Sequence, residues 1–152
     1  MTTNYEVTTD RSRFDLDAIH AFLASTYWSP GIPRETVARA IENSLCFGLL
    51  QAGAQVGLAR VVTDRATFGY LADVYVLPAH RGQGLARLLM EHVLAHPELQ
   101  GLRRMLLATR DAHGLYGRYG FTPLAAPDRL MERHRPDAYR RGIDAATPTE
   151  GR

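Results

Sequence analysis

The sequence predicts an α/β domain in which strands and helices follow one another in the order β-α-α-β-β-β-α-β-α-β-β. Short runs rich in β-branched and aromatic residues, bounded by turn residues, indicate the strands. Segments with apolar residues at helical spacing indicate the helices. With 152 residues, 45% of them hydrophobic, the chain is long enough to bury one core. We expect a single domain over residues 1–135 and a loosely ordered C-terminal tail over 136–152, because that tail is charged and has little to pack.

The first half of the chain is predicted to hold two helices and four strands. A strand over Tyr5–Thr8 precedes a helix over residues 15–25, which Asp15 caps and in which Leu16 and Ile19 lie on one face. Gly53 lies between two apolar runs and therefore indicates a hairpin. The other elements expected here are a helix over 34–43 and strands over 45–51, 55–63 and 69–77.

The second half is predicted to alternate helices and strands. A helix begins near Gly84, and Pro97 ends it. Gly120 is typical of a helix C-cap, where the backbone needs a positive φ before the chain continues. The strands expected in this half cover residues 105–109, 121–124 and, last, 130–133.

A strand, a turn and a helix over residues 71–89 are the most informative part of the chain. Gly82 and Gly84 lie in the turn, and their lack of a Cβ lets backbone N–H groups approach a ligand closely. The helix that follows has free first-turn donors and a positive dipole end, which favour phosphate. Arg81 and Arg87 add positive charge suited to phosphate oxygens. This segment therefore predicts a site for a phosphorylated ligand.

Two common phosphate-binding motifs are excluded. A P-loop needs Gly-Lys-Ser/Thr, and the chain contains no lysine, all 18 of its basic residues being arginine. A dinucleotide fingerprint needs a third glycine where Arg87 stands. The motif present is Arg-x-x-Gly-x-Ala at residues 81–86, preceded by Val-x-Pro at residues 76–78.

A second motif follows about 30 residues later, with Ala112, then Leu115-Tyr116, then Tyr119-Gly120-Phe121. In order and spacing, the two motifs resemble those of the GNAT acetyltransferase superfamily, and the resemblance covers Tyr5 to Leu124. The family often has asparagine where this chain has Thr109, so Thr109 is not counted as a cofactor contact.

The resemblance implies a mixed, mostly antiparallel central sheet with helices on both faces, and acetyl-CoA as cosubstrate. It implies that Tyr116 protonates the leaving thiolate and lies at the cofactor. It implies that the backbone of Val74, Tyr75 and Val76 pairs with the pantetheine arm. The N–H of Val76 would also polarise the thioester carbonyl. The pyrophosphate site would consist of Arg81, Gly82, Gln83, Gly84, Leu85, Ala86 and Arg87.

The general base and the acceptor site stay open. Asp73 lies inside an apolar strand, where burial would raise its pKa toward that of a base, but a neighbouring arginine such as Arg60 could equally hold it. His113 is another candidate, and water is a third. Tyr27 and Trp28 lie in a Pro-Gly loop and are either a wall against a small substrate or a hydrophobic plug.

Two functions are compatible with these residues. The first is an N-acetyltransferase that moves an acetyl group from acetyl-CoA directly to a primary amine of a small molecule or peptide. The second is a non-catalytic acyl-CoA-binding module or sensor with the same fold. Tyr116 favours the enzyme, because a binding module has no need of an acid beside the sulfur.

The composition of the chain limits the kinds of partner and the cell compartment that we expect. The net charge is only +2 and the charges are interspersed, so no nucleic-acid partner is expected. There is no apolar stretch of membrane-spanning length and no signal peptide, so we expect a cytoplasmic protein, and the absence of lysine suggests a bacterial source.

The cysteine and histidine residues do not predict a metal site. Cys46 lies in an apolar run and is predicted to be a buried thiol. His92 and His96 lack a third ligand, so no metal is expected, and a homodimer is compatible with the sequence.

Overall fold

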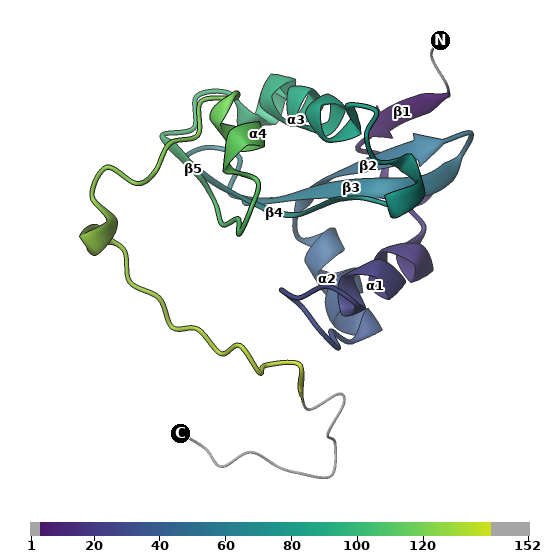
Figure 1. Cartoon of the computed structure of the whole chain (residues 1–152), viewed down its shortest axis with the longest axis horizontal. Helices are drawn as coiled ribbons and strands as arrows, with labels where there is room; N and C mark the ends of the chain where they lie inside the picture. Colours follow the sequence, from purple (N-terminus) through teal and green to yellow (C-terminus); the bar gives the residue numbers. More distant parts are fainter. Residues whose placement is uncertain (1–3, 141–152) are drawn as a thin grey trace.

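A five-stranded sheet crosses the computed structural model, which describes residues 4–140 (Figure 1). The strands lie in the sheet in chain order, and all pairs are antiparallel except the last. A parallel pair needs a crossover connection, which here contains the long helix between the two strands. The mixed, mostly antiparallel sheet expected from the resemblance is therefore confirmed. The strands are β1 (Tyr5–Thr8), β2 (Leu45–Gln51), β3 (Ala54–Thr63), β4 (Phe68–Val76) and β5 (Arg104–Leu107).

Helices cover both faces of this sheet, as expected (Figure 1). Helices α1 (Leu16–Ala24) and α2 (Arg34–Glu42) pack on one face. Helices α3 (Leu85–Ala95) and α4 (His113–Gly117) lie on the other. Asp15 caps α1 as the sequence predicts, because its side chain accepts a hydrogen bond from the N–H of Ala18 at 3.0 Å.

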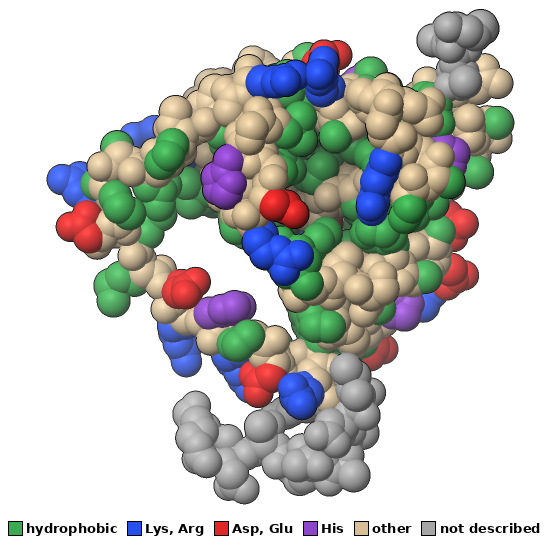
Figure 2. Space-filling model, viewed as in Figure 1, with side chains coloured by type: hydrophobic (Ala, Val, Ile, Leu, Met, Phe, Trp, Pro, Cys, Tyr) green, Lys and Arg blue, Asp and Glu red, His purple; other side chains and the backbone are tan. Residues whose placement is uncertain are grey.

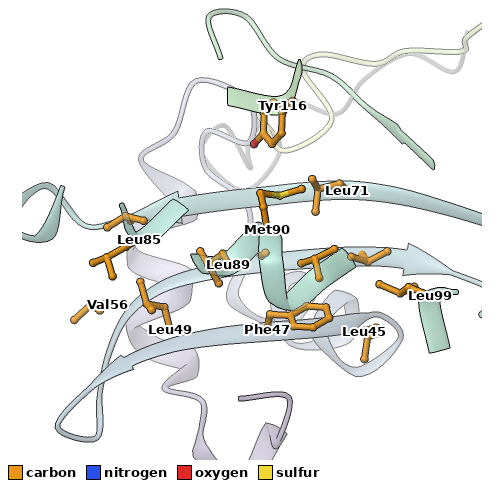
Figure 3. Packing of buried hydrophobic residues seen from close by; sticks show 14 residues of the cluster. Leu45, Phe47, Leu49, Val56, Leu71, Leu85, Leu89, Met90, Leu99 and Tyr116 are labelled. Carbon is orange, nitrogen blue, oxygen red and sulfur yellow. The ribbon is translucent and has the colours of Figure 1, made fainter. Parts of the chain in front are cut away.

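Two hydrophobic cores lie on the two faces because β2 and β3 are buried on both sides. Alternation along β2 sends Phe47 and Leu49 toward α3, while Cys46 points to the opposite face, where its thiol contacts the carbonyl of Ile41 in α2. The core on the α3 side also includes Leu89 and Met90 (Figure 3). The core on the α1 side contains Ile19, Leu23, Ile32, Val37, Ile41, Cys46, Leu58 and Tyr75.

Strand β4 carries the irregularity that shapes the site. Leu58 is opposite Tyr75 and Arg60 is opposite Ala72, so two β4 residues, Asp73 and Val74, lie opposite a single residue of β3. Asp73 has φ = 55°, a left-handed conformation that is rare outside glycine. Such a bulge bends the strand and redirects its side chains.

Strands β4 and β5 pair only as far as Leu71 and Leu107, and then they part. Beyond that point the edge of β4 over residues 72–76 has no strand beside it among the described residues. The parting leaves backbone N–H and C=O groups available to a ligand.

The prediction of two further strands at the end of the chain was wrong. Residues 121–124 and 130–133 belong to no strand of the described structure. Composition can indicate strand propensity, but a strand forms only when a neighbouring backbone accepts and donates its hydrogen bonds. We refer to residues 126–140 as the C-terminal arm, which stands away from the sheet (Figure 1). Of the predicted tail, residues 141–152 lie outside the described residues.

Candidate active site

The glycine turn at the end of β4 has the open backbone that phosphate binding needs. Gly82 and Gly84 have φ of 79° and 76°, values that other residues adopt only at a cost. A Cβ at either position would meet no other atom within 4 Å, so their backbones face open space. Gly84 is the N-cap of α3, it offers no side chain to the first-turn N–H groups, and no acidic residue occupies that turn. The N-terminus of α3 is therefore free to attract an anion.

Hydrogen bonds fix the shape of this turn. Arg81 donates from Nε to the carbonyl of Val76 at 2.9 Å, which ties the turn to the end of β4. The amide of Gln83 donates to the hydroxyl of Tyr5 and to the carbonyl of His80, both at 3.3 Å. The hydroxyl of Tyr5 also lies 2.7 Å from Nδ1 of His80. Arg81, Gln83 and Arg87 are exposed, Ala86 is half-buried, and Leu85 is buried in the α3-side core.

The three β4 residues whose backbone is expected to pair with a ligand also pack their side chains in the two cores. Tyr75 and Val76 are buried and Val74 is half-buried. Tyr75 stacks on Phe22 of α1, with ring centroids 4.0 Å apart. Side chains on the sheet faces and a free backbone edge are compatible, because the two project at right angles from the strand.

The ring of Tyr116 is buried, but its hydroxyl reaches solvent. Only 9% of the residue is exposed, and its ring meets Phe121 edge-on, with centroids 6.0 Å apart. It lies at the margin of the α3-side core, directed toward Met90 and Leu71 (Figure 3). Within residues 4–140 the hydroxyl makes no hydrogen bond, yet it is not among the buried atoms that lack one, so it reaches solvent. Burial, and secondarily Tyr27, raise its pKa.

Thr109 helps to position α4 in a way that the sequence did not reveal. Its hydroxyl accepts a hydrogen bond from the N–H of Ala112 at 3.0 Å. The N–H of Tyr116 in turn donates to the carbonyl of Ala112 at 3.2 Å. The residue that departs from the family pattern therefore shapes the loop before Tyr116.

Asp73 is held by two donors from different elements. Its Oδ2 accepts from Nε of Arg60 at 2.8 Å, and its Oδ1 accepts from Nε1 of Trp28 at 2.8 Å. Arg60 also donates to the hydroxyl of Ser44. The Asp73 and Arg60 side chains are only 11% and 18% exposed, so solvent screens this ion pair weakly. The structure thus places Asp73 beside the arginine that the sequence named, and adds Trp28.

Two loops meet beside β4: the loop between α1 and α2 and the loop between β5 and α4. Trp28 and Tyr27 meet edge-on with ring centroids 5.1 Å apart, and the guanidinium of Arg110 lies 3.8 Å from the centroid of Tyr27. Arg110, from the loop between β5 and α4, is a site residue that sequence reasoning missed, since nothing distinguishes it from the other arginines. A space-filling view shows a hollow in this face with hydrophobic side chains in its floor and charged ones around it (Figure 2).

Residues 15–121 match the model of the acetyltransferase (GNAT) family. The chain belongs to this family. A Gibberella zeae protein, named as a suspected acetyltransferase, is 36% identical over 76% of this chain and 77% of its own. A crystal structure of a suspected GNAT-family acetyltransferase from Xanthomonas campestris is 54% identical over 91% of this chain and 99% of its own, with a TM-score of 0.89. The GNAT fold is therefore confirmed.

A more distant GNAT-like structure was solved with acetyl-CoA. That protein of Clostridium acetobutylicum is 17% identical, covers 88% of this chain and 96% of its own, and has a TM-score of 0.64. At this identity the likeness shows the fold alone. The relatives come from bacteria and a fungus, so they do not decide the source of this chain.

Other features of this GNAT domain lie away from the hollow. His92 is exposed, and Nδ1 of His96 accepts from the N–H of Glu98, 3.1 Å away. In residues 4–140 no three His, Cys, Asp or Glu side chains gather as metal ligands, and none of the helices is long and apolar enough to span a membrane. Burial raises the pKa of the Cys46 thiol to about 12.

Proposed function

We propose that this GNAT protein is an acetyl-CoA-dependent N-acetyltransferase that transfers the acetyl group directly to a primary amine of a small molecule or peptide. The observation that carries the proposal is the parting of β4 from β5 after Leu71. It leaves a free backbone edge that runs toward the glycine turn, and Tyr116, whose hydroxyl reaches solvent, lies in the same core as Leu71 of β4 (Figure 3). A strand edge, a phosphate turn and an acid in one place suit a phosphorylated thioester.

The cofactor residues would divide into two groups. The first-turn N–H groups of α3, with Gly82, Gln83, Gly84, Leu85, Ala86 and Arg87, would hold the pyrophosphate. Arg81 would add positive charge there, because only its Nε is used in the bond to Val76 and a guanidinium has five donors. The edge of Val74, Tyr75 and Val76 would hold the pantetheine amides, as one strand holds another.

Tyr116 supplies the proton for the leaving group. Attack by the amine nitrogen on the thioester carbonyl forms the new C–N bond, and breaking the C–S bond releases a thiolate. Tyr116 donates its phenolic proton to that sulfur. Burial raises the pKa of Tyr116, so the phenol stays protonated at neutral pH. The N–H of Val76 would stabilise the negative charge on the carbonyl oxygen.

The proton of the amine has three candidate acceptors: Asp73, His113 and water. His113 is exposed at the start of α4. Both oxygens of Asp73 already accept hydrogen bonds, one from Trp28 and one from Arg60. We assign Asp73 the positioning of Trp28 in the acceptor wall, and assign the proton to water. Tyr27 and Trp28, both exposed, would form that wall together with Arg110.

A panel of amines tests the proposal. Acetyl-CoA alone should stabilise the protein thermally, by about 2.7 kcal/mol at one hundred times its Kd. Free CoA thiol should then appear at a rate that depends on one class of primary amine. Stabilisation with no amine-dependent release over a broad panel would favour a non-catalytic acyl-CoA-binding module instead.

The cytoplasmic location and the bacterial source of the protein also stand as proposals.

A further inference from the structure

The guanidinium of Arg110 lies at the acceptor wall without a charged partner. It stacks on the ring of Tyr27, with Cζ 3.8 Å from the ring centroid. None of the ion pairs within residues 4–140 contains Arg110, and Asp111, the next residue in the chain, is exposed and belongs to none of them either. Stacking occupies the face of a guanidinium, so its N–H donors, which lie in its plane, stay available to a ligand.

The acidic group in contact with the same wall is already neutralised. Asp73 accepts hydrogen bonds from Nε1 of Trp28 and from Nε of Arg60, both at 2.8 Å. Its side chain is 11% exposed, and its charge is balanced by the ion pair with Arg60. Asp73 therefore offers little attraction to a cationic substrate. The charge that this wall presents to an acceptor is the positive charge of Arg110.

This charge lies close to the proposed point of acetyl transfer. Tyr27 adds to the effect of burial in raising the pKa of Tyr116, and an electrostatic effect of this kind falls off with distance, so the two phenols are near neighbours. Arg110 and Tyr116 also lie in one short segment, the loop after β5 and the helix α4 that follows it. The amine must approach the thioester beside Tyr116. An anionic group bound at Arg110 is therefore expected only a few bonds from the reacting nitrogen.

We propose that the acceptor is a free amino acid, whose carboxylate binds the guanidinium of Arg110 while its α-amine meets the acetyl group; this inference rests on the proposed function. The in-plane donors of a guanidinium match the two oxygens of a carboxylate, and one positive charge balances one negative charge. Tyr27 and Trp28, 54% and 42% exposed, offer aromatic surface to the rest of the molecule. The product is an N-acetyl amino acid with its carboxylate unchanged. The N-terminus of a peptide has a neutral amide in place of that carboxylate, so a small molecule is favoured over a peptide.

Paired acceptors test the role of the carboxylate. Each free amino acid of a panel is compared with its own carboxamide, and CoA thiol release is followed at saturating acetyl-CoA. The amine of the amide loses its proton more easily, so a preference for the acid cannot come from amine ionisation. We expect kcat/KM for the best amino acid to exceed that of its amide by about tenfold or more. Equal or higher values for the amides throughout the panel would overturn the proposal.

Replacing Arg110 shows whether its guanidinium makes this distinction. Arg110→Gln should raise KM for the amino acid by about 10- to 100-fold, the usual effect of losing a charged hydrogen-bond partner, and leave kcat and the kcat/KM of the amide nearly unchanged. Arg110→Lys keeps the charge but loses the paired donors, so it should restore only part of the affinity. Arg103→Gln is the matched control, because Arg103 is exposed just before β5, at the other end of that strand. An unchanged KM for the amino acid in Arg110→Gln would refute the assignment.

A binding measurement separates the amino-acid site from the acetyltransferase activity. Calorimetry titrates the amino acids of the panel into protein saturated with CoA, which requires no turnover. Binding that Arg110→Gln weakens, with no acetylation of any amine, would remove the proposed function and leave the amino-acid site standing. Acetylation of neutral amines, with no preference for amino acids and no binding that depends on Arg110, would leave the acetyltransferase standing and overturn the amino-acid acceptor. Neither binding nor turnover would overturn both.

Discussion

Replacing Tyr116 with phenylalanine separates catalysis from stability, because the structure gives the hydroxyl no other role. The phenol makes no hydrogen bond within residues 4–140, while its ring is buried and packs edge-on against Phe121. Tyr116→Phe keeps that packing, so the free energy of unfolding should change by less than about 0.5 kcal/mol. The affinity for acetyl-CoA should change little for the same reason.

Turnover should respond very differently. Loss of a general acid lowers kcat by roughly 10²- to 10⁴-fold. The Tyr116 hydroxyl reaches solvent, so a water molecule can partly replace it as the proton donor. We therefore expect Tyr116→Phe to lower kcat by about 10- to 1,000-fold. The assay follows CoA thiol release with acetyl-CoA and a confirmed amine at saturation, alongside Tm. Tyr119→Phe, three residues away and half-buried, is the matched control and should retain most activity. Equal kcat for wild type and Tyr116→Phe, with chemistry rate-limiting, would refute the role of Tyr116.

The pH dependence of kcat gives an independent check on the same residue. A general acid acts in its protonated form, so activity is lost as pH rises through its pKa. Burial raises the pKa of Tyr116 above the ordinary value of 10.0. The kcat of the wild type should therefore show no fall assignable to a phenol below about pH 10. A descending limb near neutral pH that disappears in Tyr116→Phe would contradict this assignment.

Three other changes should give distinct results. Gly84→Val should weaken acetyl-CoA binding sharply, as measured by calorimetry. Gly101→Val is the control, because Gly101 has nearly the same φ and equally open surroundings. It should lower the stability of the fold by a similar amount and leave the affinity for acetyl-CoA unchanged. Asp73→Asn should lower kcat/KM for the amine by less than about tenfold and leave the ascending limb of the pH profile in place; loss of that limb would make Asp73 the base. Asp64→Ala should lower Tm at pH 7, because Asp64 accepts hydrogen bonds from Ala66, Thr67 and Phe68, which lower its pKa. That Tm difference should shrink below about pH 4, where Asp64 begins to bind a proton in the unfolded chain, and a constant difference down to pH 2 would contradict the assignment.

Local features of the chain were predictable from the sequence. Three local features illustrate this: the capping carboxylate of Asp15, the continuous apolar run of β2 and the glycines before α3. Each imposes its conformation through sterics or a short-range hydrogen bond, so the pattern alone indicates the structure. The candidate site residues on the turn were predicted from its glycines and arginines, whereas those on β4 were predicted from the resemblance of the two motifs to the GNAT family.

Contacts between distant residues needed the tertiary structure. The bonds from Trp28 and Arg60 to Asp73, and the packing of Arg110 on Tyr27, join elements that no spacing rule connects. The same reason explains the two missing strands. Residues 121–124 and 130–133 have strand-like composition, but β-structure also requires a paired backbone, which a sequence does not specify. The sequence by itself therefore determined the five strands that form, the long helices and the turns between them. The folded chain alone decided which side chains meet, which predicted strands stay unpaired and which strand edge stays free.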